Sequence, residues 1–167
     1  MQESYKDLFS LVNEFDTLCI TTNGIVKSSG AAVMGAGVAK TCAQLWPQTP
    51  LILGELLVSS GRNIPFHLGN VTDGNFWTET NPETEETLHF CRIFSFPTKH
   101  HYSNPSDIDL IKESCHHMVV FADQLKMKSI ALSRPGCGNG GLSWNDVRPI
   151  VGKILDDRFH VIERKGN

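Results

Sequence analysis

The sequence predicts an α/β protein, a three-layer α/β/α sandwich around a mixed, mostly parallel sheet. Short apolar, β-prone segments alternate with helix-like segments along the chain, and such interleaving favours a central sheet covered by helices on both faces. Two glycine-rich segments each follow a predicted strand and precede a predicted helix. The 167 residues fit one domain at roughly 100–200 residues per domain, so we expect a single domain over residues 1–167.

The first half of the chain is expected to contain two strands and two helices. The run Thr17–Thr22 is short, apolar and β-prone, which predicts a buried strand. Residues 38–46 form a helix-like segment that Pro47 stops, and residues 50–59 form a second one. Residues 64–68 are predicted to form the next strand.

The second half supplies the remaining strands and helices. Alternating apolar residues predict a strand over residues 88–96, and short apolar runs predict strands over residues 129–132 and 159–162. A single apolar stripe at helical spacing predicts a long helix over residues 106–125. A last helix is expected over residues 144–155.

Capping patterns indicate where the two late helices begin. Ser106 is followed three residues later by Asp109, which is typical of a helix N-terminus. Ser143 and Asp146 have the same spacing before the last helix, although Pro149 falls inside its predicted range.

Composition argues against several functional classes. A formal net charge of −3 offers no basic face, so we expect no stable binding of duplex nucleic acid. No apolar stretch reaches the roughly 18 residues of a membrane span, and the first residues lack a signal-peptide pattern, so no membrane association is expected. Five widely spaced cysteines without a C-x-x-C motif favour reduced thiols in the cytoplasm and no metal site. The acid-rich residues 73–86 are predicted to form an exposed excursion.

The glycines indicate the candidate ligand site. Eight of the 14 fall in two segments, namely Gly24, Gly30, Gly35 and Gly37, then Gly136, Gly138, Gly140 and Gly141. Glycine lets a backbone approach a ligand closely, and a helix N-terminus favours a phosphate. Two such loops at the carboxyl edge of one sheet predict a diphosphate-containing nucleotide. The alternatives are glycines that only form tight turns, or a dinucleotide fold, whose G-x-G-x-x-G motif fails here at Lys40.

Several segments of the chain resemble macro domains, the family that binds ADP-ribose. The resemblance covers about residues 5–162 and is closest to the phage and bacterial branch that contains DNA-ADP-ribosyl hydrolase antitoxins and terminal-ADP-ribose hydrolases. The segments that carry it are TNG at 22–24, GAAVMGAGVA at 30–39, WP at 46–47, FPTK at 96–99, RPGCGNGGLSW at 134–144 and DDRF at 156–159.

The resemblance implies a set of ligand-binding residues. An acid near the N-terminus accepts from the adenine amino group, an asparagine binds the distal ribose, and the two glycine loops enclose the ribose and diphosphate. In this sequence the implied residues are Asp7, Leu8, Asn23, Gly24, Gly35, Ala36, Gly37, Val38, Arg134, Gly136, Cys137, Gly138, Asn139 and Gly140. Cys137 is expected to pack in its loop rather than act as a nucleophile.

Lys99 and Asn23 are the catalytic residues that the resemblance implies. Lys99 matches the lysine of the hydrolase branch, where it attacks the anomeric carbon or stabilises charge on the leaving group. The hydrolases that act on acidic side chains also use an aspartate, and in this sequence its place is taken by Gly140. His100 and His101 are alternative proton carriers or solvated loop residues.

Three functions therefore remain open at the level of sequence. The first is hydrolysis of an ADP-ribosyl linkage at the distal ribose, the second is binding of ADP-ribose without turnover, and the third is a phosphatase acting on ADP-ribose 1″-phosphate. The expected partner is ADP-ribose or ADP-ribosylated DNA or protein, with no cofactor, and the domain is expected to be monomeric.

Overall fold

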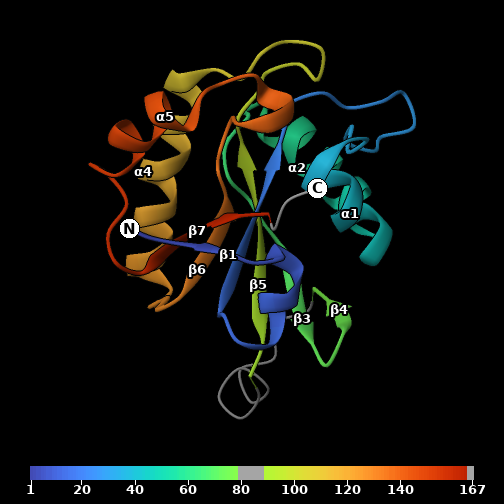
Figure 1. Cartoon of the computed structure of the whole chain (residues 1–167). Helices are drawn as coiled ribbons and strands as arrows, with labels where there is room; N and C mark the ends of the chain where they lie inside the picture. The colour runs from blue at the N-terminus through green and yellow to red at the C-terminus, as the bar shows by residue number, and fades with distance from the viewer. Residues whose placement is uncertain (79–88, 165–167) are drawn as a thin grey trace.

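The computed structural model describes residues 1–78 and 89–164 and contains one seven-stranded mixed sheet (Figure 1). The strands β1, β7, β6, β2 and β5 are mutually parallel, whereas β3 and β4 are antiparallel to their neighbours. This confirms the predicted mixed, mostly parallel sheet. Across the sheet the order is β1 (Gln2–Tyr5), β7 (Phe159–Glu163), β6 (Ile130–Ser133), β2 (Thr17–Thr22), β5 (Cys91–Pro97), β3 (His67–Thr72) and β4 (Asn75–Trp77).

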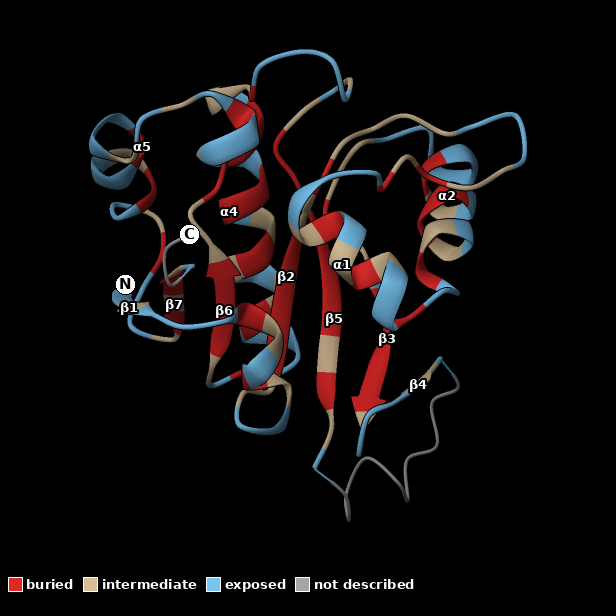
Figure 2. Ribbon diagram, turned by 45° about the vertical axis from the view of Figure 1, so that its right-hand side comes forward, coloured by how far each residue is buried: buried red, intermediate tan, exposed pale blue. Residues whose placement is uncertain are grey.

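Helices cover both faces of the sheet, as the three-layer prediction requires (Figures 1 and 2). One layer holds the 3-10 helix η1 (Leu8–Asn13), α1 (Gly37–Leu45) and α2 (Thr49–Ser60), and the other holds α4 (Ile108–Gln124) and α5 (Trp144–Val151). A short 3-10 turn, η2 (Gly138–Gly140), lies between β6 and α5. None of the helices in residues 1–78 and 89–164 is long and apolar enough to cross a membrane.

Alternating residues of the central strands build a separate core on each face. In β2, Leu18 packs into the cluster under α1 and α2, while Cys19 packs into the cluster under α4 and α5. In β5, Ile93 and Phe94 divide in the same way. All four side chains are fully buried, which is why these strands read as continuous apolar runs in the sequence.

Two strands were not predicted, and a third is shifted. β1 is polar and mostly exposed, and it is a strand because it pairs with β7, with Gln2 opposite His160. β4 is only three residues long and pairs with β3, which begins at His67 instead of residue 64. A strand defined by its pairing at a sheet edge leaves little hydrophobic periodicity in the sequence.

Several predicted boundaries need correction. β5 begins at Cys91, and Leu88, where its start was predicted, lies outside the described residues, as do residues 79–86 of the predicted excursion. The other part of that excursion forms β4 and the turn before it. The last helix, α5, runs through Pro149 and ends at Val151, four residues before its predicted end.

Neither predicted capping serine acts as a side-chain cap. The cap of α4 is Asp107, whose carboxylate accepts the backbone N–H groups of Asp109 and Leu110. Ser143 precedes α5 without a side-chain hydrogen bond to it. Ser106 stands one residue before the cap, and its side chain lies next to Gly140 instead.

Candidate functional site

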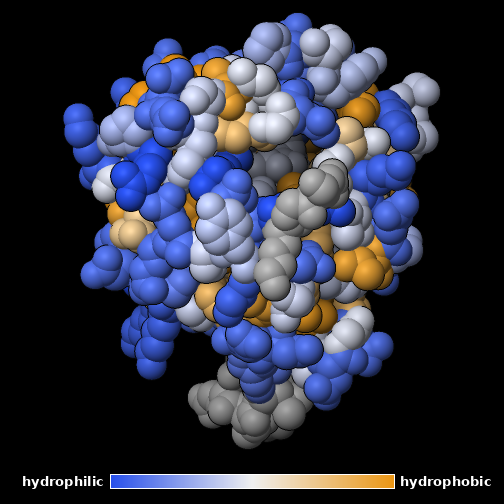
Figure 3. Space-filling view, in the orientation of Figure 1, coloured by the Kyte–Doolittle hydropathy of each residue, from blue (hydrophilic) through white to orange (hydrophobic). Residues whose placement is uncertain are grey.

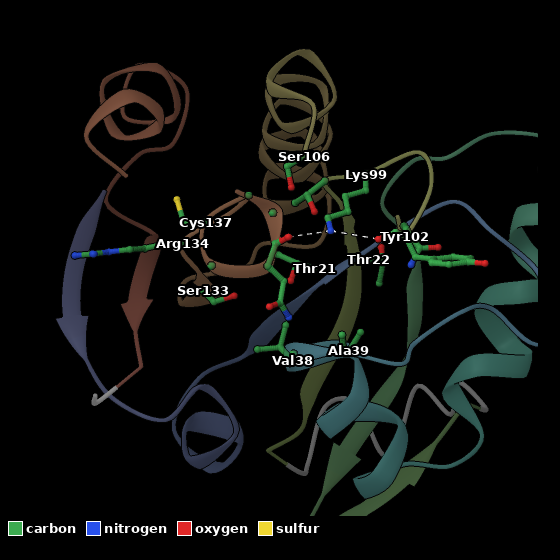
Figure 4. Close-up of a pocket in the computed structure, with 18 of the residues that line it drawn as sticks. Thr21, Thr22, Val38, Ala39, Lys99, Tyr102, Ser106, Ser133, Arg134 and Cys137 are labelled. Carbon is green, nitrogen blue, oxygen red and sulfur yellow. Dashed lines mark hydrogen bonds between the residues drawn. The ribbon is translucent and has the colours of Figure 1, made fainter. Parts of the chain in front are cut away.

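The candidate site is a cavity of about 750 Å³ at the carboxyl ends of the parallel strands (Figure 4). Thr22 ends β2, Ser133 ends β6 and Glu163 ends β7, and all three line it. Thr98, directly after β5, lines it as well. The volume is that of a site for a small molecule, and this edge of an open sheet is where α/β proteins bind ligands. The face of the protein that Figure 3 shows is mainly hydrophilic, with scattered apolar residues.

The first glycine loop presents the N-terminus of α1 to the cavity. Gly37, Val38 and Ala39 all line it, and Gly37 has a φ of 56°, a conformation that favours glycine. The N-cap residue Ala36 provides no side-chain cap. The first N–H groups of this nine-residue helix, with the positive end of its dipole, are therefore suited to an anion.

The second glycine loop faces the first across the cavity. Gly136 and Gly138 both have a φ of 77°. A Cβ atom at Gly136 would lie 2.7 Å from Ile111 and 2.9 Å from Leu142, so only glycine fits there. The loop then continues into the turn η2, which also lacks a side-chain cap. The backbone is thus turned toward the cavity over residues 136–140.

Lys99 joins the loop after β5 to the second glycine loop. Its Nζ donates to the carbonyl oxygen of Asn139 at 3.1 Å and to that of Tyr102 at 3.5 Å (Figure 4). An ammonium group has three N–H donors. Two carbonyl partners leave one donor for a ligand, so Lys99 is both a structural link and a cation on the cavity wall.

Asn23 fastens the loop that follows β2. Its Nδ2 donates to the carbonyl oxygen of Val33 at 2.9 Å, and its Oδ1 accepts the N–H of Ile25 at 3.0 Å. The amide nitrogen carries a second proton. Since Asn23 lines the cavity, this proton is the one with which the side chain can bind a ligand.

An ion pair lies on the β7 side of the cavity, whereas Lys99 follows β5, three strands away. Arg134 lies 2.9 Å from the carboxylate of Glu163, and its guanidinium lies over the Trp144 ring at 5.3 Å. Trp144 in turn donates to Glu3 on β1 at 2.9 Å. Among the described residues that line the cavity, Glu163 is the only carboxylate.

Ser106 occupies the space next to Gly140. Its hydroxyl is buried without a hydrogen-bond partner among the described residues, and its backbone N–H donates to the Gly140 carbonyl at 2.9 Å. A Cβ atom at Gly140 would collide with the Ser106 Oγ and lie 3.1 Å from its Cβ. A side chain at position 140, including a carboxylate, therefore requires Ser106 to move.

The thiol of Cys137 is the half-buried one among the five cysteines, and the other four are buried. Burial raises the pKa of the Cys137 thiol, against a smaller opposing effect of Arg134. A thiol with a raised pKa is protonated at neutral pH and is a weak nucleophile. This supports the expectation that Cys137 packs in its loop.

Solved structures decide the fold family. The macrodomain of Thermus aquaticus DarG aligns with 99% of this chain and 97% of its own length, at a TM-score of 0.71 and 24% sequence identity. Thermosipho africanus DarTG, solved in complex with ADP-ribose, aligns with 97% of this chain and 41% of its own, at a TM-score of 0.74 and 23% identity. The chain has the macrodomain fold.

Three curated proteins are similar to this chain in sequence. A DNA ADP-ribosyl glycohydrolase from Thermus aquaticus is 39% identical over 64 residues, and one from Mycobacterium tuberculosis is 27% identical over 133 residues. A Thermosipho africanus fusion of a DNA ADP-ribosyl transferase with such a glycohydrolase is 25% identical over 147 residues. The chain covers 18%, 34% and 36% of their respective lengths. No protein-family model matches the chain.

Most of the predicted site residues line the macrodomain cavity together. Besides Lys99, they come from the end of β2 and from the two glycine loops. They are Asn23, Gly35, Ala36, Gly37, Val38, Arg134, Gly136, Cys137, Gly138, Asn139 and Gly140.

Three predicted ligand residues do not line the cavity. Leu8 is 4% exposed and belongs to the core under α1 and α2. Gly24 is turned to the far side of its loop, where its N–H donates to the carbonyl oxygen of His100 at 3.2 Å. Asp7 is exposed and accepts the N–H of Phe9 at 3.2 Å as the cap of η1. Asp7 still follows β1, the neighbour of β7, so it lies near the end of the cavity that Glu163 lines.

The adjacent histidines also lie outside the cavity. His100 pairs with Asp107 at 3.0 Å, and His101 contacts the Ser103 hydroxyl at 2.7 Å. Both are therefore structural members of the loop between β5 and α4 and do not face the place where a proton would be transferred.

Sequence reasoning missed about half of the cavity wall. The missed residues are Thr21, Thr22, Val33, Ala39, Thr98, Tyr102, Ser106, Ser133, Ile162, Glu163 and Arg164. A signal for some was available, because Thr22, Thr98 and Ser133 stand at or just beyond the ends of predicted parallel strands. For Tyr102, Ser106 and Arg164 no pattern in the sequence pointed to the site.

Proposed function

We propose that this macrodomain binds ADP-ribose in the cavity and hydrolyses the bond between the distal ribose and an ADP-ribosylated DNA acceptor. The observation that carries the proposal is the placement of Lys99 at one end of a cavity whose two walls are glycine loops. Relatives named DNA ADP-ribosyl glycohydrolase, and a related fold solved with ADP-ribose, support the choice of ligand and acceptor.

The cavity suggests how the ligand is oriented. The diphosphate lies between the N-terminus of α1 and residues 136–140, where backbone N–H groups and the helix dipole favour negative charge. The distal ribose then points toward Asn23 and Lys99, and the adenosine end points toward Glu163. Asp7 remains the proposed partner of the adenine amino group, because it follows the strand that pairs with β7.

Hydrolysis in this site requires water to add to the anomeric carbon while the bond to the acceptor breaks and the acceptor takes a proton. The third N–H of Lys99 is placed to stabilise negative charge that develops on the leaving group. Asn23 holds its loop with one amide proton and contacts the ribose with the other. We further propose that the domain acts as a monomer in the cytoplasm, consistent with its unpaired cysteines.

A second candidate is a macrodomain that binds ADP-ribose without turnover. The specific observation in its favour is that Glu163, the carboxylate on the described cavity wall, is paired with Arg134 on the β7 side of the cavity, three strands away from Lys99. Among the residues that the structure describes, no carboxylate or histidine lines the cavity beside the proposed distal ribose, so a general base for water is missing there. The two candidates differ in turnover and not in binding.

Release of ADP-ribose from defined acceptors tests the proposal. The wild-type protein is incubated with ADP-ribosylated single-stranded DNA, an ADP-ribosylated protein and ADP-ribose 1″-phosphate, and the products are separated by chromatography. We expect ADP-ribose and intact DNA from the first substrate, at a rate well above that from the other two. Binding of ADP-ribose with no product from any substrate would support the non-catalytic candidate instead.

A further inference from the structure

A second groove, of about 390 Å³, lies beside the cavity and shares two chain segments with it. Asn23 lines the cavity while Gly24 lines the groove, and Lys99 and His100 divide in the same way. Hydrogen bonds fix this shared wall, because Gly24 donates to the His100 carbonyl at 3.2 Å and Asn63 donates to the Lys99 carbonyl at 3.0 Å. The groove therefore begins where the proposed distal-ribose end of the cavity stops.

The chemistry of the groove differs from that of the cavity. Arg62 is exposed, and within the described part of the chain its guanidinium has no ion pair. Apolar surface lies beside it, since Val58 on the last turns of α2 is 70% exposed and also lines the groove. A cation next to apolar surface is suited to a ligand that carries both a phosphate and a flat ring.

An exposed aromatic ring stands two residues after His100, which lines the groove. Tyr102 lines the cavity but is 53% exposed, and the ring of His101 lies 4.2 Å from its ring. Figure 4 shows the Tyr102 ring pointing away from Lys99, while its carbonyl accepts from the Lys99 Nζ. An exposed aromatic ring of this kind is a platform on which an unstacked nucleobase binds.

We propose that the groove beyond Lys99 binds the single-stranded DNA that flanks the ADP-ribosylated base, with a base on Tyr102 and a backbone phosphate on Arg62. This inference rests on the proposed function and adds the path of the acceptor. A single strand is favoured because stacking on Tyr102 needs an unpaired base. The net charge of −3 also confines nucleic-acid contacts to a local site such as this groove.

The test compares a long and a short acceptor in the same protein. ADP-ribose release is measured from an ADP-ribosylated single-stranded oligonucleotide and from an ADP-ribosylated mononucleotide, which cannot reach the groove. Arg62→Glu should raise KM for the oligonucleotide about tenfold and flatten its salt dependence by about one phosphate contact, with the mononucleotide unchanged. Lys153→Glu, which reverses the charge of an exposed residue after α5, is the matched control. It should change neither the KM for the oligonucleotide nor its salt dependence.

Tyr102 is tested with a pair of variants in the same assay. Tyr102→Ala should raise KM for the oligonucleotide about tenfold. Tyr102→Phe, which keeps the ring, should have the wild-type KM. Wild-type kinetics for Tyr102→Ala and for Arg62→Glu would overturn the groove while leaving the proposed function intact. Equal losses with an ADP-ribosylated peptide would overturn the assignment to nucleic acid. A wild-type protein that binds ADP-ribose but cleaves neither substrate would overturn the proposed function and the groove together.

Discussion

At the residue scale, Lys99 has two roles that mutation separates. Its Nζ links two loops through the carbonyls of Asn139 and Tyr102, and it faces the proposed leaving group. We expect Lys99→Ala to lower ADP-ribose release at least a hundredfold, whereas the Kd for ADP-ribose changes by less than tenfold, about 1.4 kcal/mol. Single-turnover kinetics and calorimetry measure the two quantities.

The control for Lys99→Ala is Lys112→Ala, which removes an exposed lysine from α4. It should leave both quantities unchanged. Full activity of Lys99→Ala would show that this lysine only links the loops.

Ser106 and Gly140 form a second pair that can be tested. Gly140→Ala places a Cβ against Ser106 and is expected to destabilise the fold by about 1–3 kcal/mol, the usual cost of overpacking. Adding Ser106→Gly removes the opposing atoms and should recover part of that loss. Thermal unfolding of the two single variants and the double variant measures the coupling, and purely additive effects would contradict the proposed contact.

Cys137 gives a prediction about pH. Because burial raises its pKa, its thiolate is scarce at neutral pH, and alkylation should be slow at pH 7 and rise as the pH increases through the alkaline range. Bound ADP-ribose should slow alkylation further, since Cys137 lines the cavity. Mass spectrometry follows the labelling, with the unfolded protein as the control. Rapid labelling at pH 7 would identify an activated thiol and contradict the packing role.

The site could be predicted from sequence where a residue acts through its backbone or stands in a dense motif. The loops at 35–38 and 136–140 are of this kind, and all their predicted members line the cavity. Leu8, predicted as a ligand residue, lies in the core and off the cavity wall, because its neighbour Asp7 caps a 3-10 helix that turns Leu8 inward. Tyr102 was missed because its exposure depends on how a loop without a pattern is folded.

At the scale of elements, the packing of α2 determines where the first ligand loop lies. Gly54 is buried in α2, and a Cβ atom there would collide with the carbonyl oxygen of Gly30. Ala32, two residues further on, donates its N–H to Pro50 at the start of the same helix at 2.8 Å. The loop from Asn23 to Gly37 is therefore laid directly on the helix, and a glycine is required at the contact.

Gly54→Ala should consequently affect both stability and binding. We expect a loss of about 1–3 kcal/mol in the free energy of unfolding, or roughly 2–12 °C in Tm for a domain of this size, together with weaker ADP-ribose binding. Leu51→Ala, at an exposed position of the same helix, controls for changes in α2 itself. A Gly54→Ala protein with wild-type Tm would show that the loop is free to move away from the helix.

The helices and strands with many buried residues were the ones that the sequence predicted best. Buried strands such as β2 and the long helix α4 leave strong patterns, and the structure has them near the predicted positions. β1 was missed because its residues are polar and its pairing with β7 joins opposite ends of the chain. The N-cap of α4 was assigned to the wrong residue, since Asp107 and not Ser106 caps the helix.

At the scale of the whole molecule, one sheet edge gathers residues from across the chain. The parallel strands β2, β5, β6 and β7 end at the same edge, so segments near positions 22, 98, 133 and 163 meet there. The predicted fold class already implied such an edge, but not which side chains close it. The ion pair of Arg134 with Glu163 at one end and Lys99 at the other gives the cavity its direction.

The measurement that tests the central claim most directly is a calorimetric titration of the wild-type protein with ADP-ribose, with AMP, NAD and ATP as controls. We predict selective one-to-one binding of ADP-ribose at low micromolar Kd, roughly −7 to −8 kcal/mol. Gly138→Glu, which forces a side chain into a backbone with a φ of 77° beside the diphosphate, should abolish that heat. Absence of heat with ADP-ribose, or equal heat from the Gly138→Glu protein, would contradict the account.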